Sequence, residues 1–308
     1  MIRFIAFRAL YGLVVLWLIT VFVFSMSRAA GDPRNIYLDE YITQEMWDAW
    51  GERMGLDKPL VVQYSIWLGD VLVGDFGESL HHGKSPLELI LSRIPASAQL
   101  AGIAFLFSIS VGIPLGVISA VKRGGVIDYS ARLFALLGQA MPVFWVALMA
   151  ILIFAVGLDW VPTSRRGGLD HFILPALTLG WYPAAGLLRL TRGSMLEILD
   201  AEFIKLARAK GVPQWKVIWK HALRNALIAP VTLAAVILAS FLTGTVVIES
   251  IFAWPGLGTL SIQAIKNNDF PVMSAIVLLF GVFFLFINFL VDLIYMFIDP
   301  RVRVGSTD

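Results

Sequence analysis

The stretch IPASAQLAGIAFLFSISVGIPLGVISAV, residues 94–121, holds no charged residue along its whole length. A helix needs about 20 apolar residues to cross the hydrocarbon layer of a bilayer, so this stretch is long enough to do so. Within lipid, a segment must satisfy its own backbone hydrogen bonds, which a helix does and an isolated strand does not. The stretch therefore predicts a transmembrane helix and indicates a membrane protein.

Five more runs without charge lie along the chain, and they cover residues 9–27, 133–158, 172–188, 225–248 and 270–291. The alternation of polar and apolar residues that is typical of outer-membrane strands is absent from them. The first run is longer than the apolar core of a signal peptide, so we expect it to remain as a span. The prediction is an all-α membrane protein with six transmembrane helices in a single domain, residues 1–308.

The bulk composition agrees with this fold class. Of the 308 residues, 58% are hydrophobic and 15% are charged, and the mean hydropathy is +0.79. A soluble domain carries roughly 25% charged residues, so this chain is short of polar surface. The chain has no cysteine, which excludes disulfides, thiolate metal sites and cysteine nucleophiles.

The distribution of basic residues predicts an orientation. If the N-terminus lies inside, 15 of the 24 Lys and Arg residues fall in segments on the inner side of the membrane. Loops on the cytoplasmic side are enriched in these residues. We therefore expect both termini in the cytoplasm, residues 28–93 as a long outer loop, and residues 193–230 as a cytoplasmic loop.

The outer loop, residues 28–93, has helical signals of its own. Thr43 is a suitable N-cap for a helix that includes Trp47, and Gly55 is a natural stop. A second helix is expected after Pro59, where apolar residues fall on one helical face. We expect the aromatic side chains of both helices to pack against the ends of the spans, and contact with a ligand is the alternative.

The cytoplasmic loop, residues 193–230, contains two helical patterns separated by a glycine. The first, MLEILDAEFIKLARAK, begins at Met195 and stops at Gly211, and Pro213 suits the first turn of the second. The loop is rich in Lys and Arg, so we expect a basic helix–glycine–helix elbow just beneath the membrane. From the charge alone two interpretations stay open: the elbow binds a partner protein, or it contacts anionic lipid headgroups.

No stretch of the sequence carries recognisable catalytic chemistry. GESLHHGKS, residues 77–85, has five residues rather than four between its first Gly and the Gly-Lys pair, so it is not a phosphate-binding loop. The adjacent His81 and His82 lack the further ligands that a metal site needs. There is no Ser/His/Asp set and no pair of carboxylates at workable spacing. We therefore expect no catalytic residue, no metal site and no cofactor bound by this chain.

Ionisable residues are missing from the middle of all six apolar runs. Carriers driven by an ion gradient usually keep such groups near the bilayer centre, so an energy source in another subunit is favoured over a gradient-driven carrier. Glu249 lies at the outer end of the fifth run. It is a candidate for a gate or for contact with a binding protein, and a solvated helix end is the alternative.

The segment EFIKLARAKGVPQWKVIWKHALRNAL, residues 202–227, resembles the ATPase-coupling loop of permease subunits in bacterial ABC importers, in the dipeptide, oligopeptide and nickel branch. Gly211 matches the glycine of the family pattern, Ala207 its second alanine and Leu223 its leucine. The positions that depart from the general pattern are Lys205, Leu206, His221 and Arg224. The segments ARAKG and HALRNA are nevertheless typical of the peptide branch itself, so these departures narrow the resemblance to that branch of the family.

Further motifs resemble the same family, in the same order along the chain. They are AGDP (30–33), LDKP (56–59), GDFGES (74–79), VKRG (121–124), MPVFW (141–145), ILPALTLG (173–180), TRGSMLEIL (191–199), ESIFAWPGLG (249–258) and LVDLIYMFIDPRVR (290–303). Together with the elbow, these motifs extend the resemblance over most of the chain.

The resemblance implies the type I ABC importer permease fold and a multi-pass location in the bacterial cytoplasmic membrane. The implied partners are a second, similar permease in a heterodimer, two cytoplasmic ATPases that bind ATP and Mg, and an extracytoplasmic solute-binding protein, with no nucleic acid. The chain would be no enzyme, and it would form half of the path for peptides or similar small solutes. Nickel and oligosaccharides are the alternatives within the branch.

The resemblance also implies which residues take part in coupling. In this chain the coupling loop would use Glu202, Lys205, Ala207, Lys210, Gly211, His221 and Leu223. The candidates for the translocation path or its gate are Gln139, Met141 and Glu249.

Overall fold

The computed structural model describes residues 2–29, 34, 43–53, 55–79 and 81–298, and these residues form helices joined by turns, without a strand. The chain divides into two compact units. Unit 1 comprises Met1–Pro95 and Thr259–Phe286, and unit 2 comprises Ala96–Gly258 and Ile287–Asp308. The motif AGDP at 30–33 and the last part of the C-terminal motif, 299–303, lie outside the described residues.

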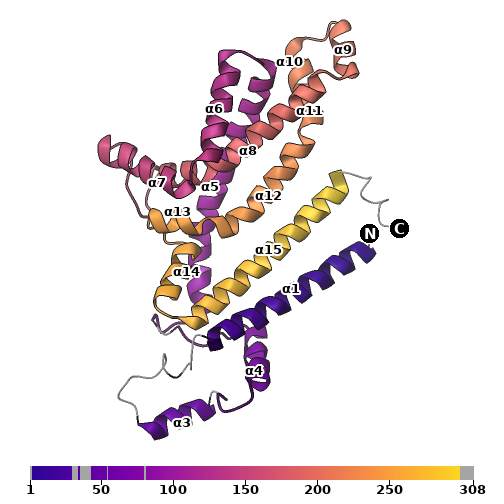
Figure 1. Ribbon diagram of the computed structural model, residues 1–308. Helices are drawn as coiled ribbons and strands as arrows, with labels where there is room; N and C mark the ends of the chain where they lie inside the picture. Colours follow the sequence, from indigo (N-terminus) through magenta and orange to yellow (C-terminus); the bar gives the residue numbers. More distant parts are fainter. Residues whose placement is uncertain (1, 30–33, 35–42, 54, 80, 299–308) are drawn as a thin grey trace. The chain divides into compact units, whose positions relative to one another are not determined.

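Unit 1 is built mainly from the N-terminal helices. It holds α1 (Ile2–Ala29), α3 (Gln44–Arg53), α4 (Leu60–Leu72), the start of α5 (Pro86–Val121), most of α14 (Leu257–Lys266) and the first part of α15 (Phe270–Ile298). α1 and α15 approach each other closely at a glycine, because a Cβ added at Gly281 would lie 2.9 Å from Ile19 Cδ1. In Figure 1 the first part of α15 runs beside α1.

The helical signals of the outer loop are confirmed. α3 begins after Thr43, whose hydroxyl oxygen caps the helix at 3.4 Å, and Gly55 follows the end of α3 with a φ of +65°. In α4, the rings of Tyr64 and Trp67 lie 5.5 and 5.7 Å from the ring of Phe24 in α1. The aromatic side chains of α4 therefore pack against the end of a predicted span, as expected.

The motif GDFGES ends in a buried contact within unit 1. Ser79 Oγ donates a hydrogen bond of 2.5 Å to Asp269 Oδ2, and both side chains are buried. Asp269 directly precedes α15, and its Oδ1 accepts from Val272 N at 3.4 Å, as an N-cap does. The outer loop is therefore tied to the first turn of α15.

Unit 2 is built around α8. It holds the rest of α5, α6 (Val126–Ala140), α7 (Val143–Ala150) with a π-helical continuation (Ile151–Gly157), a 3-10 turn (Leu169–Phe172), α8 (Ile173–Leu199), α9 (Glu202–Ala209), α10 (Gln214–Lys216), a π-helical turn (Val217–Ala222), α11 (Leu223–Ala226), α12 (Ile228–Gly244), α13 (Val246–Ile251) and the end of α15. α8 packs on α6, α7 and α12, and the core includes the buried Leu100, Leu187 and Trp254.

Two glycines let α5 approach α8 closely. A Cβ added at Gly112 would lie 2.6 Å from Ala184 O, and one added at Gly116 would lie 2.7 Å from Thr191 Cβ. The two glycines fall on one face of α5, as in the small-xxx-small packing of membrane helices. The backbone-to-backbone contact between these helices therefore depends on residues without a side chain.

The structure contains four helices that are long and apolar enough to cross a membrane: Ala6–Ala29, Pro86–Val121, Leu169–Leu199 and Phe270–Leu290. The third and fifth predicted runs differ from a single helix, because each contains a sharp bend. Val126–Ala140 meets Val143–Gly157 at 108°, and Gln214–Ala226 meets Ile228–Phe241 at 56°. The number of spans is six if each bent pair is one span, and the membrane boundaries stay predictions.

The bend in the third run falls at Met141 and Pro142. Proline has no N–H to continue a helix, and its ring disfavours helical geometry at the preceding residue. Met141 is extended, with φ −90° and ψ 135°. α6 therefore ends at Ala140, and α7 starts in a new direction, as Figure 1 shows.

The fourth predicted run, 172–188, stops at the first charged residue, but α8 continues to Leu199. Arg189 and Arg192 therefore lie inside a long helix rather than in a loop. Their charges do not end the helix, because a charged side chain is compatible with helical backbone geometry.

The first half of the elbow also differs from the prediction. One helix was expected from Met195 to the turn at Gly211, but the helix is interrupted at Ala201, which is extended with φ −69° and ψ 148°. A separate helix, α9, then starts at Glu202. The break separates the long α8 from the short helix that leads into the turn.

Candidate functional site

The elbow, residues 193–230, turns at Gly211. The φ of Gly211 is +75°, in the left-handed region that glycine enters without strain. Its N–H donates to Arg208 O at 3.0 Å, and Val212 N–H donates to Ala207 O at 3.2 Å. These two bonds form a Schellman motif, which closes the C-terminus of a helix. The turn predicted at Gly211 is confirmed, and its glycine takes the left-handed conformation.

One side of the elbow is anchored inside unit 2. Ile204 and Val217 are fully buried, and they belong to a cluster that includes Val117 of α5 and Met195 of α8. Leu223 is partly buried against the same cluster. Close packing of this kind transmits displacement. The elbow and the adjoining ends of α5 and α8 therefore form one packed cluster.

Other side chains of the elbow are exposed, and they are both apolar and basic. Phe203, Leu206, Trp215 and Trp219 are 45%, 55%, 63% and 48% exposed. The exposed basic residues are Lys205, Arg208, Lys210, Lys216, Lys220 and Arg224. Aromatic side chains are enriched where one protein binds another, and exposed apolar groups mark interaction surfaces. The exposed part of the elbow is a candidate docking surface.

The residues predicted for the coupling loop divide into two groups. Exposed are Glu202, Lys205, Lys210 and Gly211, and half-buried are Ala207, His221 and Leu223. Glu202 and Lys205 form a surface ion pair of 2.8 Å, and Leu223 contributes packing to the anchor. Sequence reasoning missed Trp215 and Trp219, although two tryptophans in a basic loop were a usable signal.

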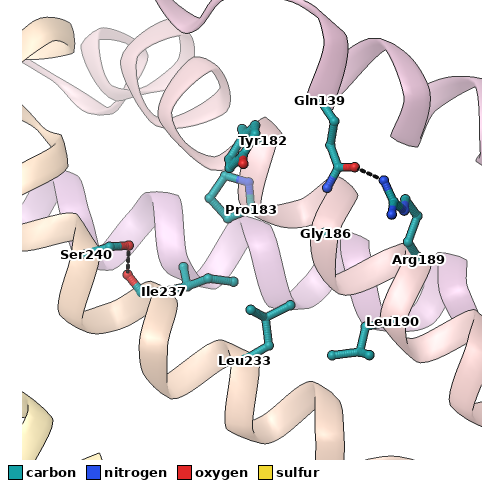
Figure 2. Close-up of a pocket in the computed structure, with 9 residues that line it drawn as sticks. All are labelled: Gln139, Tyr182, Pro183, Gly186, Arg189, Leu190, Leu233, Ile237 and Ser240. Carbon is teal, nitrogen blue, oxygen red and sulfur yellow. Dashed lines mark hydrogen bonds between the residues drawn. The ribbon is translucent and has the colours of Figure 1, made fainter.

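A second candidate site is a pocket of about 470 Å³ inside unit 2, shown in Figure 2. Residues of α6, α8 and α12 line it, namely Gln139, Tyr182, Pro183, Gly186, Arg189, Leu190, Leu233, Ile237 and Ser240. Gln139 Oε1 accepts a hydrogen bond from the Arg189 guanidinium, and Figure 2 shows the two side chains pointing toward each other. The Ser240 hydroxyl donates to Ile237 O at 2.8 Å.

The structure brings one of the three predicted path residues into this pocket. Gln139 lines it, whereas Met141 and Glu249 are not among the lining residues. Met141 lies at the bend between α6 and α7. Sequence reasoning missed Arg189, because the fourth apolar run was ended at the first charge. The signal that would have found Arg189 is the helical pattern that continues beyond it.

Glu249 is the centre of a buried hydrogen-bond cluster, so the interpretation of a solvated helix end is wrong. Its side chain is fully buried. Its Oε1 accepts from Ser97 Oγ at 2.6 Å, and its Oε2 accepts from Gly258 N at 2.7 Å. A Cβ added at Gly256 would clash with both carboxylate oxygens. The motif ESIFAWPGLG is therefore a loop folded around the side chain of its own first residue.

A buried ion pair joins α6 to α8. Arg192 Nε and Nη2 donate to the two oxygens of Asp128 at 2.8 and 3.0 Å. Ser119 Oγ and Gly124 N donate to the same carboxylate at 2.6 and 3.0 Å. A bidentate pair fixes geometry as well as charge. The pair therefore holds together two of the helices that line the pocket.

The part of the chain that the structure describes holds no group of three or more His, Asp or Glu residues that could bind a metal ion. The arrangement offers two surfaces suited to binding. The elbow exposes a docking surface, the pocket offers a guanidinium on a largely apolar wall, and α8 connects the two sites.

Two family models match the sequence. The model described as binding-protein-dependent transport system inner membrane component matches residues 112–304. The model of the N-terminal region of such membrane components matches residues 1–101. Together they cover nearly the whole chain, including both the elbow and the outer loop.

Curated relatives are similar over their full length. The oligopeptide transport system permease protein AppB of Bacillus subtilis is 37% identical over 315 residues, which cover 98% of this chain and 100% of that protein. The dipeptide transport system permease protein DppB of Alkalihalophilus pseudofirmus is 35% identical, with 96% of this chain and 98% of that protein covered.

Solved structures with a similar fold are those of ABC transporters. An inward-facing structure of the MetNI methionine ABC transporter matches with a TM-score of 0.57 at 20% identity, and the match covers 69% of this chain and 97% of that chain. An amino acid ABC transporter with histidines matches with a TM-score of 0.52 at 15% identity, covering 68% and 93%. At these identities the similarity concerns the fold alone.

Proposed function

This chain belongs to the family of binding-protein-dependent transport system inner membrane components, and we propose that it forms half of the path for peptides in an ATP-driven importer. It is a multi-pass inner membrane protein with the type I ABC importer permease fold, and it is not itself an enzyme. The observation that carries the proposal is the elbow, which is anchored to α8 on one side and exposes aromatic and basic side chains on the other.

The elbow is proposed to dock on a cytoplasmic ATPase subunit, and that subunit binds ATP and Mg. Exposed side chains such as Phe203 and Trp215 would fill recesses of the ATPase, and the lysines would lie at the rim of the contact. Because the elbow is packed against α8, movement of the ATPase would displace α8. Tyr182 and Arg189 of α8 line the pocket, so the displacement would reach the path.

The remaining partners belong to the same proposal. A second homologous permease would complete the path that this chain's pocket begins, and a second ATPase would bind that permease. A solute-binding protein would deliver the solute from outside, in agreement with the family's dependence on a binding protein. The orientation is also proposed: both termini and the elbow lie in the cytoplasm, which the distribution of Lys and Arg supports.

Peptides are the proposed solute. Full-length relatives are named as oligopeptide and dipeptide permeases, and they share more than a third of their residues with this chain. Nickel and oligosaccharides are the alternatives within the branch, and the pocket favours neither. The guanidinium of Arg189 would repel a metal cation, and the mainly apolar pocket walls offer few hydrogen-bond partners to an oligosaccharide.

Reconstitution tests this function. The two permeases, the two ATPases and the binding protein are assembled in proteoliposomes, and uptake of a tritiated tripeptide is followed with ATP or with a non-hydrolysable analogue. We expect the tripeptide to accumulate with ATP but not with the analogue. Vesicles that lack this chain should accumulate none. Uptake of nickel or an oligosaccharide with no uptake of di-, tri- or longer peptides would overturn the peptide assignment.

A further inference from the structure

The pocket of unit 2 has a single charged side chain on its wall. Arg189 is the one charged residue among the nine described residues that line the pocket. The rest of the wall consists of apolar side chains, a glycine and the polar groups of Gln139, Tyr182 and Ser240. A lone guanidinium on a largely apolar wall is a strong determinant of what the pocket can bind.

Arg189 lies toward the inner end of the span that α8 is expected to form. It is about 24 Å from Ile173 along the helix axis at roughly 1.5 Å per residue, which places it within a hydrocarbon layer of roughly 30 Å and nearer the inner boundary than the centre. A charge within that layer is costly, and charged residues in spans face a protein interior or a water-filled cavity where they mark solute paths. Arg189 fits this rule, since its side chain is exposed and faces the pocket.

The partners of Arg189 differ from those of Arg192, one turn further along α8. Arg192 is bound by both oxygens of the buried Asp128, so its charge is compensated within the fold. Arg189 donates to the amide oxygen of Gln139, and no carboxylate in the described part of the chain pairs with it. Its positive charge is therefore uncompensated by these residues, and its guanidinium keeps further N–H donors besides the one that binds Gln139.

We propose that Arg189, oriented by Gln139, is a subsite for the terminal carboxylate of a peptide in transit. This inference rests on the proposed function as a peptide permease. A guanidinium binds a carboxylate through two parallel N–H···O bonds, a geometry that lysine or an amide does not reproduce. Figure 2 shows the Gln139–Arg189 pair at one end of the lining and Ser240 at the other.

The remaining wall suits the rest of a short peptide. Leu190, Leu233 and Ile237 present aliphatic surface that accepts side chains of varied shape without specific hydrogen bonds. The volume of about 470 Å³ lies within the range of small-molecule sites, roughly 300–1,000 Å³. Recognition of the common end group with tolerance of the side chains is what a carrier of many peptides requires.

The test measures binding to the assembled transporter in nanodiscs, without the binding protein, so that selection by that protein does not enter. Scintillation proximity gives the affinity for a tritiated tripeptide with a free carboxyl end and for the same peptide with an amidated end. We expect the wild type to bind the free acid at least tenfold more tightly than the amide. Arg189→Gln should bring this ratio close to one, and Arg189→Lys should retain part of it.

The matched control is Arg132→Gln, the same change on α6. Arg132 is exposed, lies over the ring of Tyr129 and is not among the residues that line the pocket. Arg132→Gln should keep the wild-type ratio of acid to amide affinity. All variants should assemble as the wild type does, measured by copurification of the four subunits.

Three results would overturn the subsite: no tripeptide binding by the wild type, an unchanged ratio in Arg189→Gln, or an equal loss of affinity for acid and amide. The last would indicate that Arg189 pairs with a residue of the second permease. If the wild type still accumulates tripeptides in proteoliposomes, the peptide function stands while the subsite falls. If it accumulates none, the function itself is wrong.

Discussion

Replacement of Gly211 by valine should destabilise the turn of the elbow without damaging the rest of the fold. For an L-residue the left-handed conformation costs about 1–2 kcal/mol, and it is least accessible to β-branched residues. A Cβ added at Gly211 would meet nothing within 4 Å, so the cost is conformational and involves no clash. At about 1.4 kcal/mol per factor of ten, the equilibrium constant of the turn should fall roughly 5–30-fold.

The assay uses the assembled transporter in proteoliposomes, with tripeptide uptake and the ATP hydrolysis stimulated by loaded binding protein as readouts. We expect both rates to fall by a similar factor in Gly211→Val, while copurification of the subunits is unchanged. Gly211→Asn should retain most of the activity, because asparagine tolerates a positive φ better than other residues.

The control is Gly83→Val in the outer loop. Gly83 also has a positive φ, +59°, and a Cβ there would likewise meet nothing within 4 Å, so the variant carries a comparable local cost far along the chain from the elbow. Stimulated ATP hydrolysis should stay near the wild-type rate. Wild-type rates in an assembled Gly211→Val transporter would refute the reasoning that the left-handed turn is needed for coupling.

Three further outcomes are expected. Ala207→Asp places a charge on the half-buried side of α9 and should abolish stimulated ATP hydrolysis while the two permeases still copurify; retained stimulation would contradict the docking role. Asp128→Asn leaves the guanidinium of Arg192 without its counter-charge and should lower the free energy of unfolding by about 3 kcal/mol, measured as a lower thermal midpoint. An unchanged midpoint would contradict a stabilising role for this ion pair. Glu249→Ala removes the acceptor of two buried hydrogen bonds and should cost about 2 kcal/mol by the same measurement, with Glu249→Gln costing less.

Features that depend on local pattern could be predicted from the sequence. The apolar runs became helices, because the tendency of a long apolar segment to form a helix in lipid does not depend on distant residues. The positive φ of Gly211 and the cap at Thr43 follow from residues within one turn. The bend before Pro142 was foreseeable for the same reason, because proline cannot continue a helix through its missing N–H.

Features that depend on distant partners could not be predicted in this way. The bond between Ser97 and Glu249 joins residues 152 positions apart, so the sequence around Glu249 indicated only a helix end. Gln139 and Arg189 meet because α6 stops at a proline and α8 does not stop at a charge. The pocket arises from this three-dimensional packing, and a rule that ends spans at charges leaves out Arg189, the charged residue of its lining.

The most direct test of the central claim, that the elbow docks on an ATPase, is a cross-link from the elbow. The chain contains no cysteine, so Lys210→Cys can carry a single photoactivatable cross-linker in the assembled transporter. Asp48→Cys in the outer loop is the matched control. We predict that Lys210→Cys yields an adduct with the ATPase subunit, identified by mass spectrometry, and that Asp48→Cys yields none. An adduct of Lys210→Cys with lipid alone would contradict the account and favour contact of the elbow with membrane headgroups.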